Sequence, residues 1–300
     1  MTFTPSELSR AVPPPRDLAE GLEHTRARRG TFGEPFVYLA TVGSTNDVAA
    51  RLADAGAAEG ATVVADEQTT GRGRLGRSWF SAEGAGLYVS VVIRPDGAIP
   101  DPGGNFRKLG SDPNLQKLPS GAALPTLPTL LTLAAGVALA EAVQEATGLQ
   151  PDIKWPNDLM CGRRKLAGIL AEASAKGADL DYVVVGFGIN VRAAAYPPEV
   201  ADRATSIEAE LGRAVDRGLV LGLTLARLAA AREALRRNAA GAILEQWRRM
   251  SPSAVGRPVS WQGAGGPRRG TTAGLDADGA LLVDVQGSRE RVIAGEVIWL

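Results

Sequence analysis

The sequence is poor in two residue types that carry much enzyme chemistry. It contains one cysteine, Cys161, and one histidine, His24. A lone cysteine excludes an internal disulfide bond. A lone histidine argues against a Ser-His-Asp triad and against a zinc site built on several histidines. Any chemistry that this chain performs therefore has to work without imidazole.

Excess charge of one sign and long apolar runs are also missing. Lys+Arg and Asp+Glu number 33 each, which argues against broad binding to nucleic acid or to a membrane surface. The first ten residues lack the basic start and the apolar run of a secretory signal. The most apolar window, 130–143, is too short to span a bilayer. We therefore expect a cytoplasmic protein without membrane contact.

The N-terminal stretch 1–33 differs from the rest of the chain. It holds a run of three prolines and a crowded group of arginines, and we expect a flexible tail with a short helix from Arg16 to Arg28. A DNA-binding winged helix needs about twice this length and a core of its own. The stretch therefore does not predict DNA binding.

The remaining chain predicts two folded parts. Alternating strand-like and helix-like segments over 34–252 indicate an α/β catalytic domain, interrupted at 95–128 by a proline-rich surface excursion. After that domain, short apolar runs between glycine-rich turns predict a small antiparallel barrel at 253–300. The expected helices lie at 48–57, 130–147, 219–237 and 240–250, and the expected strands at 36–39, 61–65, 86–94, 152–155, 166–173 and 182–187.

The most distinctive local feature is the loop 71–77, which reads Gly-Arg-Gly-Arg-Leu-Gly-Arg. Its glycines let the backbone bend and expose N–H groups, and its arginines carry forked donors that suit phosphate or carboxylate. The spacing matches neither a P-loop nor a dinucleotide fingerprint. A solvated hairpin loop or a nucleic-acid contact is the alternative interpretation.

Two further segments place polar groups at strand ends. Lys154-Trp155-Pro156-Asn157-Asp158 stops a strand and offers a charge and several oxygen atoms, although an Asx turn would explain the last three residues equally well. Gly186-Phe187-Gly188-Ile189-Asn190 lets a ligand approach the backbone closely, or else is a sheet end with a capping Asn190. Lys165 begins an otherwise apolar strand. Trp79, just after the 71–77 loop, and Trp155 and Phe187, within these two segments, are aromatic, and burial in the core alone could explain each of them.

Taken together, five blocks resemble the biotin–protein ligase family, and they occur in the family's order. The blocks are Gly43-Ser44-Thr45-Asn46, the segment Gln68 to Trp79, Lys154 to Leu159, Lys165 to Leu170, and Gly186 to Val191. The resemblance covers roughly residues 36–300. It implies a mixed-sheet domain like that of class II synthetases, followed by a small SH3-like barrel.

The resemblance also implies a role for each matching residue. Ser44, Thr45, Asn46 and Gln68 would hold the ureido head of biotin. Arg72 and Arg74, with the backbone of Gly71 and Gly73, would grip its carboxylate and the phosphate. Lys154 would act at the reacting centre together with these two arginines, and Lys165 and Gly168 would contact the bound ligand. Arg77, Trp79 and Asn157 would lie on the nucleotide side, and Asn190 near the phosphates or the metal.

The implied chemistry suits a chain that is poor in histidine. The carboxylate of biotin is already ionised at neutral pH and can attack the α-phosphate of ATP without a general base. That step needs positive charge, in-line positioning and Mg²⁺, with ATP and biotin as substrates. The acceptor would be a lysine on a biotin carboxyl carrier domain of an acyl-CoA carboxylase.

Three alternatives remain at this point. A ligase for lipoate would share the same logic, but a dithiolane ring would prefer apolar partners to Ser44, Thr45 and Asn46. A regulator that binds nucleic acid conflicts with the neutral charge and the short N-terminal stretch. An interaction module would explain the C-terminal barrel but not the five blocks.

Overall fold

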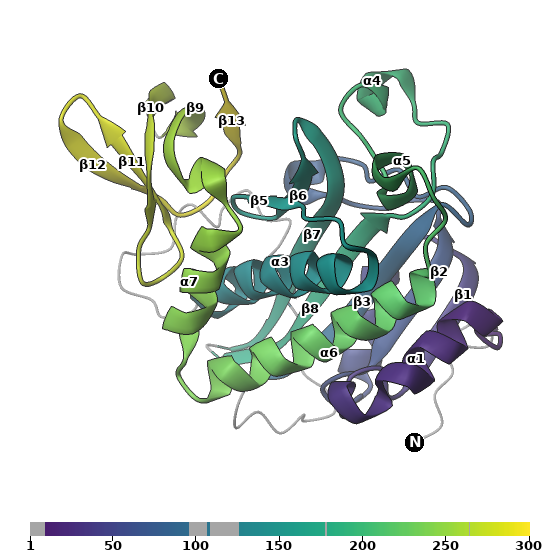
Figure 1. The fold of residues 1–300 in the computed structure, drawn as a ribbon. Coiled ribbons are helices and arrows are strands. Elements are labelled where there is room, and N and C mark those ends of the chain that lie inside the picture. Colours follow the sequence, from purple (N-terminus) through teal and green to yellow (C-terminus); the bar gives the residue numbers. More distant parts are fainter. Residues whose placement is uncertain (1–9, 96–106, 109–125, 178, 264) are drawn as a thin grey trace.

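The computed structural model describes residues 10–95, 107–108, 126–177, 179–263 and 265–300. The larger of two sheets is built from β1 (Phe36–Val42), β2 (Thr62–Gln68), β3 (Gly86–Ile93), β4 (Arg107–Lys108), β5 (Asp152–Lys154), β6 (Asp158–Cys161), β7 (Arg164–Lys176) and β8 (Asp179–Asn190). Its order is β1-β2-β3-β8-β7-β6-β5, with β4 beside β7 (Figure 1). β1 and β2 are parallel, whereas the other neighbours are antiparallel, so the sheet is mixed as expected.

Helices cover both faces of this sheet. Four of them lie on one face: α1 (Arg16–Arg29), α3 (Thr126–Thr147), α6 (Arg217–Arg236) and α7 (Ala240–Arg249) (Figure 1). The helix α2 (Thr45–Asp54) packs on the opposite face, where Val48 and Leu52 meet alternate strand residues such as Val63 and Val184. This alternation is the period of two that a sheet buried on both faces requires. Two short helices, α4 (Pro198–Ala201) and α5 (Ile207–Leu211), follow β8.

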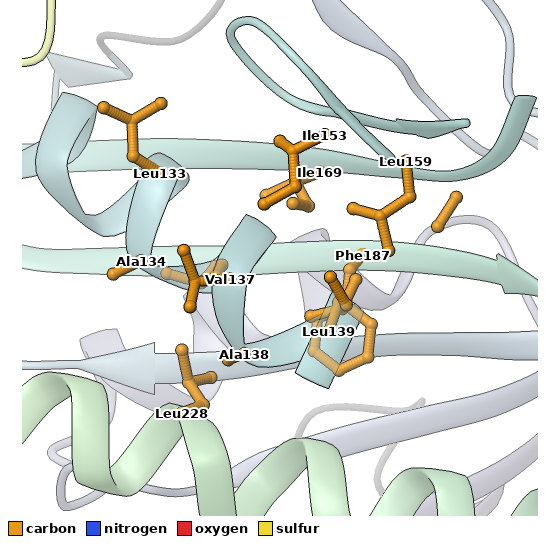
Figure 2. Close-up of a cluster of buried hydrophobic side chains, with 14 of the residues drawn as sticks. Leu133, Ala134, Val137, Ala138, Leu139, Ile153, Leu159, Ile169, Phe187 and Leu228 are labelled. Carbon is orange, nitrogen blue, oxygen red and sulfur yellow. The ribbon is translucent and has the colours of Figure 1, made fainter. Parts of the chain in front are cut away.

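The helix α3 forms the centre of the core. Leu133, Val137 and Leu139 belong to one buried cluster with strand residues such as Ile153 and Ile169, and Leu228 of α6 belongs to the same cluster (Figure 2). The segment Leu127–Thr147 has a mean hydropathy of 1.4 and is long enough to cross a membrane by length and composition. The apolar stretch is thus longer than the sequence pattern indicated. In this fold it lies between the sheet and α6, and 61% of its most apolar window is buried.

The N-terminal stretch is not a free tail over its described part. The expected helix forms as α1, and it packs against α6 through the buried side chains of Leu18 and Leu22. Arg217 of α6 fastens the contact, because its guanidinium lies 2.6 Å from Asp17 Oδ2 and 2.8 Å from Asp66 Oδ1. The prediction of a flexible tail was therefore wrong for α1, which belongs to the domain.

Most of the expected excursion at 95–128 lies outside the described residues. Its described parts are the two-residue strand β4, which pairs with β7, and the first turn of α3. Because α3 begins at Thr126, the helix takes in the last three residues that we had assigned to the excursion.

The C-terminal residues form the second sheet, as expected from their short apolar runs. It consists of β9 (Val255–Gly263), β10 (Gly266–Leu275), β11 (Leu281–Val285), β12 (Ser288–Val292) and β13 (Val297–Trp299). All its pairs are antiparallel, in the order β12-β11-β10-β9-β13. It packs against the larger part of the protein, since the indole of Trp155 donates a hydrogen bond of 3.0 Å to the carbonyl of Gly279. This contact holds the second sheet beside the end of β5.

Candidate active site

A cavity opens where the start of α2, the glycine- and arginine-rich loop, the β5–β6 turn and the second sheet meet. The start of α2 contributes Ser44, Thr45 and Asn46. The loop side contributes Gln68, Arg72, Gly73, Arg74, Arg77 and Trp79. The strands β5 to β7 and their turns contribute Lys154, Asn157, Lys165 and Gly168, and the second sheet adds Gly295, Glu296 and Val297. The structure thus brings together thirteen of the fifteen predicted site residues, all except Gly71 and Asn190.

One end of the cavity is a network of neutral polar groups. Gln68 Oε1 accepts hydrogen bonds from the backbone N–H of Thr45 at 2.9 Å and from the Thr45 hydroxyl at 3.0 Å. Ser44 occupies the N-cap position of α2, yet its side chain makes no capping bond, so Gln68 satisfies the first N–H group instead. The Asn46 carbonyl oxygen accepts a bond of 2.5 Å from the Ser90 hydroxyl. Thr45, Asn46 and Ser90 are buried and Gln68 is partly buried, and the hydrogen bonds between them fix their orientations.

Two glycines of β8, Gly186 and Gly188, form part of the cavity floor. A Cβ atom on Gly186 would lie 2.0 Å from Asn46 Oδ1, and one on Gly188 would lie 2.3 Å from Trp79 Nε1. Both side chains therefore rest directly on the sheet, at positions where any larger residue would collide with them. The buried Nε1–H group of Trp79 has no hydrogen-bond partner among the described residues. A buried donor without a partner is costly, and a bound acceptor would relieve that cost.

Five cationic side chains line the cavity, and three of them are neutralised by carboxylates. Arg72 makes two bonds of 2.8 Å to Asp47 and one of 3.2 Å to Glu172. The ammonium group of Lys165 lies 2.6 Å from Asp158 Oδ1. Arg77 pairs with Glu296 and so connects the loop to the start of β13.

The other two cations, Arg74 and Lys154, have no ion pair within the described ranges. Burial lowers the pKa of Arg74, and Asp158 opposes that effect. Burial also lowers the pKa of Lys154, against the opposing influence of Asp158 and Glu296. Lys154 Nζ lies 5.0 Å from the ring centre of Trp299, which is a cation–π contact. A desolvated cation without a counter-ion attracts anions, so this end of the cavity, here named the anion-binding end, is suited to an anionic ligand.

Arg72 has carboxylate partners within the chain. The sequence predicted that it would grip the carboxylate and phosphate of the ligand together with Arg74. In this structure its guanidinium faces two carboxylates of the chain itself, and the hydrogen bonds to Asp47 contribute most to raising its pKa. Arg72 therefore supplies no net positive charge to the cavity.

The loop that carries these arginines closes on itself. Gly73 N–H donates to the Arg77 carbonyl at 2.7 Å, and Trp79 N–H donates to the Gly71 carbonyl at 2.8 Å. Gly71 lies behind the cavity wall, and a Cβ there would come within 2.6 Å of the Trp79 carbonyl oxygen. Its contribution to the site is thus to let the two ends of the loop meet.

Asn157 and Asn190 have structural partners. The side chain of Asn157 donates to the Ile169 carbonyl at 2.8 Å, which ties the β5–β6 turn to β7 while leaving the residue on the cavity wall. The buried side chain of Asn190 donates to the Thr205 carbonyl at 2.9 Å, away from the cavity. Nothing at Asn190 therefore supports its expected place near phosphate or metal. Among the described residues, no group of three or more His, Cys, Asp or Glu side chains could hold a metal ion.

Sequence reasoning missed several residues of this site, among them Glu296, which pairs with Arg77. Asp47 and Glu172 hold Arg72, and Ser90 holds Asn46. Ser90 left a signal, because it is the polar residue within the apolar strand β3. Asp47 directly follows the block that ends at Asn46, and Glu172 lies two residues after the block that ends at Leu170. Nothing in the sequence relates either residue to Arg72.

Comparison with known proteins agrees with this architecture. The sequence profile described as "Biotin/lipoate A/B protein ligase family" matches residues 38–102 and 114–190, and "Biotin protein ligase C terminal domain" matches residues 255–299. The biotin--[acetyl-CoA-carboxylase] ligase of Mycobacterium tuberculosis is 33% identical over 268 residues, covering 87% of this chain and 88% of that protein.

Two further relatives carry a second activity in their names, and a solved structure shares the fold. The bifunctional ligase/repressor BirA of Bacillus spizizenii is 31% identical over 290 residues, covering 96% of this chain and 81% of that protein. The match to BirA of Bacillus subtilis is 37% identical over 214 residues, covering 71% of this chain and 58% of that protein.

The biotin protein ligase of Aquifex aeolicus in complex with biotin and ATP is 29% identical, with a TM-score of 0.68, covering 88% of this chain and 97% of that structure.

The matches extend over both sheets, and the matched blocks contain the residues that line the cavity. The small second sheet corresponds to the SH3-like C-terminal domain of this family. The chain belongs to the biotin/lipoate A/B protein ligase family and, by its C-terminal domain and its relatives, to the biotin protein ligases within it.

Proposed function

We propose that the chain is an ATP-dependent biotin protein ligase that forms biotinyl-5′-AMP and transfers the biotinyl group to a lysine of a carrier protein. The observation that carries this proposal is the division of the cavity into two ends. Neutral donors and acceptors gather at one end, at Thr45, Asn46 and Gln68. At the other end, Arg74 and Lys154 are the cations without ion pairs within the described ranges.

This division matches the two ends of biotin. The ureido ring is a neutral group with two N–H donors and a carbonyl acceptor, and it needs partners of the kind that the Thr45 end offers. The valerate carboxylate and the α-phosphate are anions, and they need the charge of Arg74 and Lys154. The partly buried Trp79 ring lines the cavity and offers an apolar surface to the body of the ligand.

The first step needs no proton transfer. The ionised carboxylate attacks the α-phosphorus of ATP, an acyl–phosphate bond forms, and the bond to the β-phosphate breaks with release of pyrophosphate. Negative charge develops on the α-phosphate oxygens during this step, and two preorganised cations stabilise it most. Mg²⁺ enters as the complex with ATP, as part of that substrate.

The second step is aminolysis of the mixed anhydride. The neutral amine of the acceptor lysine attacks the carbonyl carbon, an amide bond forms, AMP leaves, and the amine gives up a proton. The site has to keep water away from the anhydride until the acceptor arrives. The loop between Gly71 and Trp79 contributes several residues to the cavity wall and suits that duty.

We propose a biotin carboxyl carrier domain of an acyl-CoA carboxylase as the acceptor, and the cytoplasm as the compartment. The name of the relative from Mycobacterium tuberculosis and the family match support the acceptor. We expect no DNA binding, although the BirA relatives are named as repressors.

The proposal is tested by measuring pyrophosphate release from Mg·ATP with biotin and, separately, with lipoate, followed by the intact mass of an added carrier domain. Release with biotin and a single biotinyl mass shift on the carrier is the expected result. Release with lipoate alone would keep the mechanism and overturn the substrate. A chain that releases pyrophosphate with neither acid would contradict the proposal.

A further inference from the structure

Glu172 lies behind the cavity and connects two of its walls. It sits on β7, on the sheet face that α2 covers, and it is not among the residues that line the cavity. Its side chain is 12% exposed. A carboxylate in such a place has to be paired, because an isolated buried charge is costly.

Glu172 Oε2 accepts two hydrogen bonds from different parts of the site. Asn46 Nδ2 donates to it at 2.7 Å, and Arg72 donates to it at 3.2 Å. Asn46 belongs to the start of α2 and Arg72 to the loop, so a single oxygen atom joins the neutral polar end of the cavity to the loop that covers it. The two bonds are charge-assisted, which makes them stronger than bonds between neutral groups.

The bond to Glu172 also decides which way the Asn46 amide points. The Asn46 oxygen accepts from Ser90, whose hydroxyl lies 2.5 Å away and is fully buried. The Asn46 nitrogen therefore faces a group that can only accept, and a flipped amide would turn its oxygen toward the carboxylate. The amide keeps one N–H group, and its orientation is settled before any ligand arrives.

We infer that Glu172 is a positioning residue of the biotin site, which fixes the orientation of Asn46 and the place of Arg72 so that the ureido head meets preoriented partners. This inference rests on the proposed function. Arg72 then has a structural role, because its guanidinium joins Glu172 to Asp47 in α2. This role agrees with the neutralisation of its charge by the two carboxylates. Preorganisation of this kind raises affinity because the ligand does not have to order the site.

The test is the variant Glu172→Gln, which keeps the size of the side chain and removes its charge. A glutamine can offer an N–H group to Asn46, so the amide loses its fixed direction. We expect the Kd for biotin to rise by about tenfold to a hundredfold, the range that the loss of a charge-assisted hydrogen bond gives. The KM for ATP should stay within about threefold, since neither partner of Glu172 lies at Arg74 or Lys154.

A matched control separates positioning from general loss of stability. Asp66 is also a largely buried carboxylate bound to an arginine, at 2.8 Å from Arg217, but it lies on β2 away from the cavity. Asp66→Asn should lower the melting temperature while leaving the Kd for biotin unchanged. Glu172→Asp keeps the charge on a shorter side chain and should recover part of the lost affinity.

The outcomes distinguish this inference from the proposed function. Adenylation by the unaltered chain with biotin tests the function, whatever the variants do. If Glu172→Gln binds biotin as the unaltered chain does, or loses biotin and ATP affinity equally, the positioning role is wrong. A selective loss of biotin affinity that Asp66→Asn does not share would establish it.

Discussion

The substitution Lys154→Ala tests the anion-binding end of the cavity most sharply. Lys154 is half-buried, burial lowers its pKa, and it has no ion pair among the described residues. A unit charge at about 4 Å from a phosphate oxygen contributes about 4 kcal/mol at an effective dielectric constant near 20. Removal of a single preorganised donor from a transition state costs about a hundredfold to a thousandfold in rate. We therefore expect the single-turnover rate of adenylation to fall by that factor.

Biotin binding should respond less than the adenylation rate, because the partners of the ureido head at the other end are unchanged and Arg74 still supplies charge for the carboxylate. The rate is measured by rapid quench with labelled ATP, and the Kd for biotin by calorimetry on the same preparations. Lys176→Ala is the matched control, since Lys176 is also a partly buried lysine but lies at the end of β7 and does not line the cavity. A similar loss in biotin binding and in adenylation rate would refute the assignment of Lys154 to the transition state.

Three further predictions follow from the same geometry. The base limb of the pH–rate profile for adenylation should reflect Lys154: raising the pH through its lowered pKa removes the ammonium charge, and Lys154→Arg should move that limb to higher pH, whereas an unchanged limb would assign it to another group. Arg74→Gly should release biotinyl-5′-AMP into solution, measured by filter retention of labelled intermediate, and equal retention would show that Arg74 does not hold it. Gly186→Ala should weaken biotin binding by at least about tenfold, because the new methyl group would lie 2.0 Å from Asn46 Oδ1; an unchanged Kd by calorimetry would mean that Asn46 can move without cost.

The sequence predicted most of the regular structure because its signals are local. Alternating and continuous apolar runs mark β1, β3, β7 and β8, and the apolar stretch before Thr147 marks α3. The strand β6 was missed because only a turn separates it from β5. Its four residues carry too short a pattern to be read by themselves.

The packing of α1 was missed because its sequence looks charged throughout. Its buried residues include Leu18, Leu22, Thr25 and Arg29, which recur at helical spacing, but two of the four are polar. Arg29 can be buried because its guanidinium donates hydrogen bonds to backbone carbonyls, at 3.2 Å to Leu22 and 2.6 Å to Phe32. From the sequence alone, a helix face with this composition is predicted to be solvent-exposed. Only the structure shows that α6 covers it.

At the candidate site, the residue types were predictable but their partners were not. The five blocks identified the cavity wall, including Lys154 and Arg74. Whether a cation is free or neutralised depends on residues far away in the sequence, as with Arg72 and Glu172, which are 100 positions apart. That information arises when α2, the loop and β7 come together, and it changes the role that Arg72 can have.

We propose that Arg74 and Lys154, rather than Arg72, supply the positive charge for the adenylate phosphate. The most direct measurement is a crystal structure of the chain with a hydrolysis-resistant analogue of biotinyl-5′-AMP. We expect phosphate or acyl oxygens within hydrogen-bond distance of Lys154 Nζ and of the Arg74 guanidinium, with Arg72 still bonded to Asp47 and Glu172. A phosphate held by Arg72, with both of those ion pairs broken, would contradict this proposal.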